Sequence, residues 1–244
     1  MTPETPLSRS SALLGAAAMS RLASARVVVV GVGGVGSWCA EALVRTGLGN
    51  LVLVDADTVA VSNLNRQCPA TTLTLGRPKV EAMAERLRAI RPDVAVEARF
   101  ERFEQEADFA RLGVCDIVVD AIDSVACKAA LIRAATASGV QLVSSMGAAF
   151  RTDPTQVRVS RFDRVTGDGL ARALRQRLKR ERRFPPAPFM CVWSSETPCT
   201  LAPGLVTECR SGIPVRGSLM PVTATFGMCL ASTAIGILTK GTRT

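Results

Sequence analysis

A glycine-rich segment near the N-terminus could bind a phosphate. It reads Gly31-Val32-Gly33-Gly34-Val35-Gly36-Ser37 and follows directly after an apolar run, residues 27–30. Glycines permit a tight turn, and the N-terminus of a following helix offers amide donors and a positive dipole to a phosphate. Asp55 closes the next apolar run, where a carboxylate can accept hydrogen bonds from ribose hydroxyls. The pattern predicts an adenine-nucleotide site, and taken by itself it favours NAD.

The polar residues after Asp55 favour ATP instead. Asp57, Asn63, Arg66 and Lys79 follow within a short stretch of the chain. A dinucleotide pyrophosphate needs little cationic support beyond a helix end, whereas a triphosphate needs Arg and Lys side chains. We therefore expect a nucleoside triphosphate in this site.

Two carboxylates, Asp120 and Asp123, lie at the carboxyl end of the apolar run 115–119. Ligands bind at the carboxyl ends of strands in open α/β sheets, and a carboxylate there can hold Mg²⁺ against phosphates. The chain contains no histidine, which removes the commonest general base and metal ligand. The chemistry must therefore depend on carboxylates, Arg, Lys, Cys, backbone amides and the substrates themselves.

The elements that position these residues alternate between short β-branched runs and helical stretches. This alternation predicts an α/β fold with a Rossmann-like, mostly parallel sheet and helices on both faces. We expect residues 1–25 to form an N-terminal arm and residues 26–150 to form the ATP-binding domain. Residues 151–244 are expected to form a C-terminal α+β extension of the same structural unit, beyond the nucleotide-binding sheet.

The predicted extension contains a basic helix over residues 168–183. The net charge of +9 and the density of cations in this helix favour contact with a nucleic-acid backbone, although a solvated helix face would also look like this. The residues expected to contact tRNA are Arg172, Arg175, Lys179, Arg182 and Arg183. The chain between Arg216 and Lys240 carries no charge and fits a buried strand or helix better than a membrane span.

The eight cysteines do not form a recognisable metal motif. No pair has the C-x-x-C spacing of a zinc site, so no zinc is expected. The N-terminus lacks a basic start followed by a continuous apolar run, so no secretory signal is predicted. We expect a cytoplasmic protein with reduced thiols, with peripheral or C-terminal membrane association as the lesser alternative.

These residues together resemble the family of adenylating enzymes that includes ThiF, MoeB and the ubiquitin-activating enzymes. The motifs that carry the resemblance are Gly31-x-Gly33-Gly34-Val35-Gly36-Ser37, Asp55-x-Asp57, Asn63-x-x-Arg66-Gln67, Lys79 and Asp120-x-x-Asp123. Within this family the chain is similar to the branch of tRNA threonylcarbamoyladenosine dehydratases. The further motifs that indicate this branch include Asp153-Pro154-Thr155-Gln156, Cys191-Val192-Trp193-Ser194-Ser195-Glu196 and Pro221-Val222-Thr223-Ala224-Thr225-Phe226-Gly227.

The resemblance implies a role for each matching residue. The backbone from Gly33 to Ser37 would hold phosphates, Asp55 the ribose, Asn63, Arg66 and Lys79 the triphosphate, and Asp123 the magnesium ion, with Asp57 at the reacting end. The implied reaction starts with attack of the threonine carboxylate of N6-threonylcarbamoyladenosine in tRNA on the α-phosphorus of ATP. The acyl-adenylate then cyclises and expels AMP. The resemblance also suggests a homodimer, a structural monovalent cation and sulfur-relay proteins as partners.

The chain departs from the family pattern at two places. Ala12 stands where members of the branch often carry an arginine thought to reach a neighbouring subunit, so Arg9 or Arg21 would have to replace it. Cys209 falls near the position of a reactive thiol in relatives of the ubiquitin-activating enzymes, and Arg210 beside it could activate a thiolate. Two other functions remain open: adenylation of a sulfur-carrier C-terminus with Cys209 as acceptor, and an NAD-binding oxidoreductase or sensor.

Overall fold

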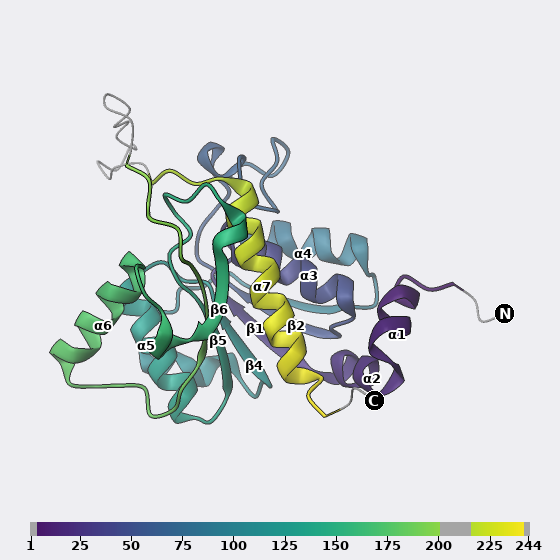
Figure 1. Cartoon of the computed structure of the whole chain (residues 1–244). Helices are drawn as coiled ribbons and strands as arrows, with labels where there is room; N and C mark the ends of the chain where they lie inside the picture. Colours follow the sequence, from purple (N-terminus) through teal and green to yellow (C-terminus); the bar gives the residue numbers. More distant parts are fainter. Residues whose placement is uncertain (1–3, 201–215, 242–244) are drawn as a thin grey trace.

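The computed structural model describes residues 4–200 and 216–241, in which seven strands form one sheet (Figure 1). The strand order is β3-β2-β1-β4-β5-β7-β6, and every neighbouring pair is parallel except β6 with β7. The strands are β1 (Arg26–Val30), β2 (Asn50–Val54), β3 (Ala95–Arg99), β4 (Ile117–Asp120), β5 (Gln141–Ser145), β6 (Val157–Arg161) and β7 (Met190–Ser194). From β1 the chain adds β2 and β3 towards one edge of the sheet, and it then returns to place β4 on the other side of β1 and continues towards the opposite edge. The strand order therefore reverses between β1 and β4. This is the position at which open α/β sheets bind ligands.

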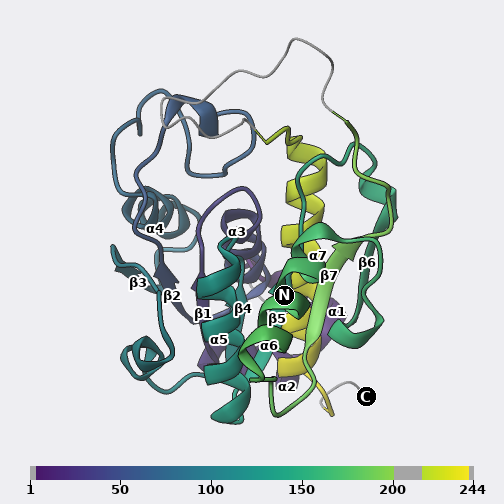
Figure 2. The same ribbon diagram turned by 90° about the vertical axis from the view of Figure 1, so that its left-hand side faces the viewer.

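Helices cover both faces of this sheet, as the sequence predicts (Figures 1 and 2). The helices are α1 (Ser8–Leu14), α2 (Ala16–Ser24), α3 (Gly36–Thr46), α4 (Lys79–Ile90), α5 (Val125–Ala137), α6 (Gly169–Glu181) and α7 (Met220–Leu238). The short 3-10 helices are η1 (Val61–Asn63), η2 (Glu106–Leu112), η3 (Pro154–Gln156) and η4 (Phe162–Arg164). Helices α3, α4 and α7 pack on one face, and α5 and α6 pack on the other.

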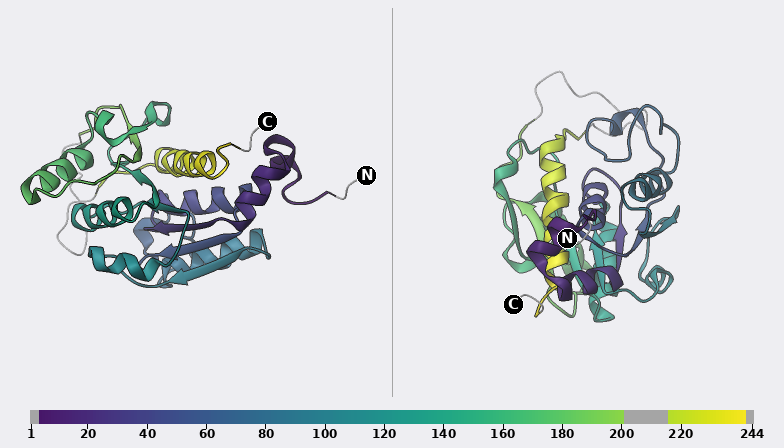
Figure 3. Two further views of the ribbon diagram at one scale, coloured as in Figure 1. Left: turned by 90° about the horizontal axis from the view of Figure 1, so that it is seen from below. Right: turned by 90° about the vertical axis from the view of Figure 1, so that its right-hand side faces the viewer.

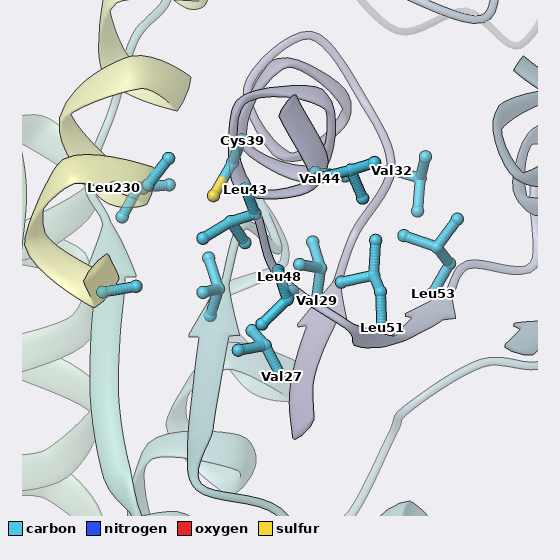
Figure 4. Packing of buried hydrophobic residues seen from close by; sticks show 14 of the residues in the cluster. Val27, Val29, Val32, Cys39, Leu43, Val44, Leu48, Leu51, Leu53 and Leu230 are labelled. Carbon is cyan, nitrogen blue, oxygen red and sulfur yellow. The ribbon is translucent and has the colours of Figure 1, made fainter. Parts of the chain in front are cut away.

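The valine run of β1 shows why this strand lies at the centre. Val27 and Val29 point towards α3 and α7, while Val28 and Val30 point to the opposite face, and all four are buried. Figure 4 shows the apolar cluster on the face covered by α3 and α7, in which Val27 and Val29 pack with Leu43 of α3. A strand that is covered on both faces needs apolar side chains at every position, so it reads as a continuous apolar run rather than an alternating one.

The last two strands correct one expectation. Residues beyond 151 do not leave the sheet that is predicted to bind the nucleotide, because β7 pairs in parallel with β5 and β6 pairs with the far edge of β7. The reason is that Met190–Ser194 is an apolar strand able to extend the parallel sheet, and its burial pattern does not distinguish it from the strands before it.

The uncharged C-terminal segment is the helix α7, which lies across α3 on the sheet (Figure 1). Phe226 and Leu230 are fully buried against this layer. Gly227 permits the close approach, because a Cβ atom there would lie 2.6 Å from the carbonyl oxygen of Val35. By length and composition α7 could cross a bilayer, and it is the one such helix among the described residues. The N-terminal arm lies near its C-terminal end, where Arg21 donates to the carbonyl of Lys240 at 2.9 Å (Figure 3).

Candidate active site

A cavity of about 810 Å³ lies at the carboxyl ends of β2, β1, β4 and β5. Its walls are the glycine turn after β1, the polar residues after β2, the start of α5 and the loop after β5. The first residues of α6 and Thr223 of α7 also line it, as do residues 101–103 after β3, Pro198, Arg216 and Ser218. The cavity thus lies at the reversal of strand order, where the sequence places its candidate residues.

The glycine turn cannot be built from larger residues. A Cβ atom at Gly36 would lie 1.8 Å from the carbonyl oxygen of Gly31, and Gly31 itself has a φ of 94°. Gly31, Gly33 and Gly34 line the cavity, whereas Gly36 and Ser37 do not. Ser37 is fully buried, its amide and hydroxyl both donate to Gly33, and its Oγ accepts from the amide of Cys68 at 3.1 Å. Gly36 and Ser37 therefore shape the turn, while the three earlier glycines form its surface.

The carboxylates after β2 are already engaged with the protein. Asp55 accepts from the amide of Val32 at 2.6 Å and from the amide of Asp57 at 2.8 Å. The ammonium of Lys79, the first residue of α4, donates to Asp57 at 2.8 Å. Asn63 caps its own turn by accepting from the amide of Ala60 at 3.0 Å. All four predicted residues line the cavity, so the structure brings them together as expected.

Arg66 lies over the glycine turn. Its Cγ atom is 3.2 Å from the position that a Cβ of Gly34 would take, and Trp38 of α3 donates to its carbonyl at 2.9 Å. The guanidinium donates to the carbonyl of Ser62 and to the side chain of Asn65. Burial lowers the pKa of the Arg66 guanidinium, which indicates a partly desolvated cation facing the turn. An anionic ligand on the glycine turn would restore the interactions that desolvation removes.

The two carboxylates after β4 have different environments. Asp123 is exposed and lines the cavity, whereas Asp120 is fully buried and does not. Lys128 and Ser144 both donate to Asp120 at 2.7 Å. Among the described residues no group of three or more His, Cys, Asp or Glu side chains could hold a metal ion. A magnesium ion here would therefore need phosphate oxygens to complete its ligands, with Asp123 as the available carboxylate.

Sequence reasoning missed two buried polar side chains in this cavity. Gln67 and Arg151 both line it, and both have buried atoms without a hydrogen-bond partner: Oε1 of Gln67, and Nε and Nη1 of Arg151. Gln67 belongs to the motif Asn63-x-x-Arg66-Gln67, but the sequence analysis predicts no function for its side chain. Arg151 has no spacing that would single it out, because its loop is recognisable only in three dimensions. Unpartnered buried polar groups are uncommon, and here they fit a cavity that holds a polar ligand.

Some cations of the basic helix make contacts within the protein and are not free to bind a partner. Arg175 donates to the carbonyls of Phe162 and Val165 and stacks over the Phe162 ring at 4.8 Å. Arg183 pairs with Glu106 of η2 at 2.8 Å. The remaining predicted cations, Arg172, Lys179 and Arg182, are exposed. Arg172 and Lys179 of α6, together with Arg182 directly after its last residue, form what we call the free basic face of α6.

Three further predictions concern residues away from the cavity. Cys209 lies outside the described residues. Ala12 and Arg9 are exposed on α1, and Arg21 of α2 contacts Lys240, so none of them lines the cavity of its own chain.

The chain shares sequence and structure with known proteins over most of its length. The model of the ThiF family matches residues 7–244. The tRNA threonylcarbamoyladenosine dehydratase of Escherichia coli is 40% identical over 243 residues, covering 91% of this chain and 89% of that protein. The Haemophilus influenzae protein of the same name is 34% identical, covering 91% and 88%. The crystal structure of the E. coli dehydratase with ATP superposes with a TM-score of 0.84 and 37% identity, covering 96% of this chain and 93% of the other.

Proposed function

Because the chain belongs to the ThiF family, we propose that it uses ATP to adenylate a carboxylate, and that this acid is the threonine carboxylate of N6-threonylcarbamoyladenosine in tRNA. The observation that carries the proposal is the cavity itself. It combines a glycine turn with Arg66, Lys79 and Asp123, and it contains unpartnered buried polar atoms of Gln67 and Arg151. The similar E. coli enzyme has been crystallised with ATP and with AMP, which supports ATP as the nucleotide rather than NAD.

The reaction that fits this cavity has two steps. A carboxylate oxygen attacks the α-phosphorus of ATP, the bond to the bridging oxygen breaks, and pyrophosphate leaves. The nucleophile within the same modified base then closes on the activated carbonyl, and AMP departs with the oxygen that the acid has lost. The net change is loss of water from the modification, with that oxygen carried away on AMP.

The side chains present suit these steps. The glycine turn, Arg66 and Lys79 would hold the phosphates and offset the charge that develops on pyrophosphate. Asp123 would hold Mg²⁺, which would neutralise phosphate charge when bound. Both steps depend on positioning and electrostatic support more than on a strong base, and this is consistent with a chain that has no histidine.

The free basic face of α6 supports tRNA as the substrate. Arg172, Lys179 and Arg182 are exposed on a helix whose first residues, Gly169 and Leu170, line the cavity. A phosphate backbone that crosses this helix would lie beside the entrance, where a modified base could enter. A homodimer, a structural monovalent cation, sulfur-relay partners and a cytoplasmic location complete the proposal as expectations.

The test is release of AMP and pyrophosphate with three candidate acids. We expect strong stimulation by tRNA that carries the threonylcarbamoyl group and none by unmodified tRNA. A carrier protein ending in Gly-Gly serves as the third substrate, because E. coli molybdopterin-synthase adenylyltransferase is 38% identical to this chain over 132 residues, covering 54% of this chain and 52% of that protein. Stimulation by the carrier alone would replace the tRNA proposal, and tight NAD binding without ATP binding would remove adenylation altogether.

A further inference from the structure

One buried cation in the cavity has unpaired nitrogens. Arg151 is 2% exposed, yet its Nε and Nη1 atoms have no hydrogen-bond partner. The other two buried arginines of the described residues are well paired. Arg91 donates to the carbonyl of Leu48 and pairs with Asp93, and Arg133 pairs with Glu106 and Glu181. Because a buried guanidinium without partners destabilises a fold, Arg151 is better explained by a ligand than by folding.

The loop that carries Arg151 is fixed on both sides of this residue. Phe150 adopts a φ of 59°, an uncommon conformation for a residue other than glycine. Its amide donates to the carbonyl of Gly217 at 2.8 Å, and its own carbonyl accepts from the amide of Cys199 at 2.8 Å. On the other side, the amide of Thr152 donates to Glu196 at 2.9 Å. The backbone on both sides of Arg151 is therefore fixed, so the loop directs this side chain into the cavity before any ligand arrives.

Glu196 does not satisfy the guanidinium. Burial by itself would raise the pKa of the Glu196 carboxyl, but hydrogen bonds from Thr152 and Asp153 outweigh it and lower the pKa, and the charge of Arg151 adds a smaller effect in the same direction. Its oxygens accept from the amides of Thr152 and Asp153 and from the hydroxyl of Thr152. Glu196 thus anchors the loop, and the side chain of Arg151 remains available to an anion in the cavity.

The order of strands indicates which anion this is. Asp55 follows β2, the glycine turn follows β1, Asp123 follows β4, and Arg151 lies in the loop after β5. Ribose, phosphates and metal would therefore occupy the cavity from β2 to β4. Arg151 belongs to the next strand, on the side away from Lys79, where the second substrate must meet the nucleotide. A guanidinium is the side chain best suited to a carboxylate, since it offers several fixed donors.

We propose that Arg151 binds the carboxylate that is to be activated and presents its oxygen to the α-phosphorus of ATP. The inference rests on the proposed function, because it takes that acid to be the threonylcarbamoyl carboxylate of the modified tRNA. Arg151 is a substrate-binding residue in this arrangement, whereas Arg66 and Lys79 bind the nucleotide.

The test compares Arg151→Gln and Arg151→Lys with the wild-type protein. We expect Arg151→Gln to raise KM for modified tRNA at least tenfold, while its Kd for ATP, measured by calorimetry, stays within twofold of wild type. Arg151→Lys, which keeps the charge, should recover part of the loss. Arg158→Gln, an exposed arginine on the neighbouring strand β6, removes the same charge outside the cavity and should leave KM for modified tRNA within twofold.

A second measurement separates substrate binding from a structural role. Because the free protein holds Arg151 buried with unpaired nitrogens, Arg151→Met should keep or raise Tm while it abolishes the response to modified tRNA. A fall in Tm of several degrees, an unchanged KM in Arg151→Gln, or a loss of ATP affinity as large as that of Arg66→Ala would each overturn the assignment. Absence of turnover in the wild-type protein would instead show that the proposed function is wrong, and the assignment would fall with it.

Discussion

Lys79 and Asp57 form an ion pair of 2.8 Å at the edge of the cavity, and the two partners differ in exposure. The side chain of Lys79 is 7% exposed and that of Asp57 is 58% exposed. Asp57 is thus a partner that water can solvate, while the ammonium is held inside the cavity. A triphosphate that enters can share or replace Asp57 as the partner of Lys79 without leaving a buried charge unpaired.

We expect Lys79→Ala to weaken ATP binding and to slow AMP formation by a factor of ten to a hundred. A hydrogen bond to a charged group contributes about 1.5–3 kcal/mol, which corresponds to that range. Calorimetry with ATP and a pyrophosphate-release assay measure the two effects. Arg77→Ala is the matched control, because Arg77 stands two residues earlier, pairs with Glu85 and does not line the cavity. Wild-type affinity in Lys79→Ala would contradict the role of the lysine.

Gly36→Ala should abolish ATP binding and destabilise the fold. The added methyl group would lie 1.8 Å from the carbonyl oxygen of Gly31, so the turn could not close in its present form. We expect a loss of several kcal/mol in the free energy of unfolding, because the atoms nearest to the new methyl group belong to the backbone of Gly31 and to the Cβ of Ala121. These atoms cannot move aside as the end of a flexible side chain could. Urea unfolding gives this value. Gly236→Ala in α7 meets no atom within 4 Å and should be neutral or slightly stabilising.

The half of the cavity that we propose binds the nucleotide could be predicted from the sequence, because its residues stand at fixed positions relative to apolar strands. The glycine turn, Asp55, Lys79 and Asp123 all lie where the strand pattern places them. The sequence could not show that Asp120 is buried. Its partners Lys128 and Ser144 come from α5 and β5, and the pairing exists only after the sheet forms.

The side of the cavity that we propose binds the acid could not be predicted from the sequence for a related reason. Arg151 stands among ordinary loop residues, and its burial depends on contacts with chain segments around Cys199 and Gly217. The basic helix could be predicted from the sequence. Which of its cations bind other parts of the fold could not. Arg175 donates to the carbonyls of Phe162 and Val165, which lie 13 and 10 residues earlier in the chain. Helical periodicity predicts a stripe, whereas such contacts depend on the packing of neighbouring loops.

The buried pair of Lys128 and Asp120 should be a major determinant of stability. Both side chains are completely buried, at 2.7 Å from each other. Lys128→Met leaves the carboxylate without its cation, and we expect a loss of about 3–5 kcal/mol in the free energy of unfolding. Lys128→Met combined with Asp120→Leu removes both charges and should recover much of this loss. If the single variant unfolds in urea within 1 kcal/mol of wild type, the pair is not the determinant that its burial indicates.

Stability should fall in acid partly through Glu41 of α3. Burial by itself would raise the pKa of this carboxyl, but hydrogen bonds from Arg86, Cys68 and Arg45 outweigh it and lower the pKa to about 2, from an ordinary value of 4.5. Since the folded protein has the lower pKa, this contribution to stability is complete above pH 4.5 and is lost as the pH falls towards 2. Glu41→Gln should therefore unfold with a smaller pH dependence in this window. Glu81→Gln, an exposed carboxylate on α4, is the control and should keep the wild-type slope.

The free basic face of α6 should determine the salt dependence of tRNA binding. Each cation that contacts a phosphate releases condensed counterions, so replacing Arg172, Lys179 and Arg182 with Gln should weaken binding and reduce the slope of log Kd against log salt by about 2–3. A triple variant at Arg88, Arg111 and Arg158 makes the same change in net charge on exposed residues elsewhere. It should lower affinity only slightly and leave the slope close to wild type. Equal slopes for the two triple variants would mean that total charge, and not this helix, attracts the tRNA. A reduced slope in the first variant alone would place the phosphate backbone across α6, beside the residues that open into the cavity.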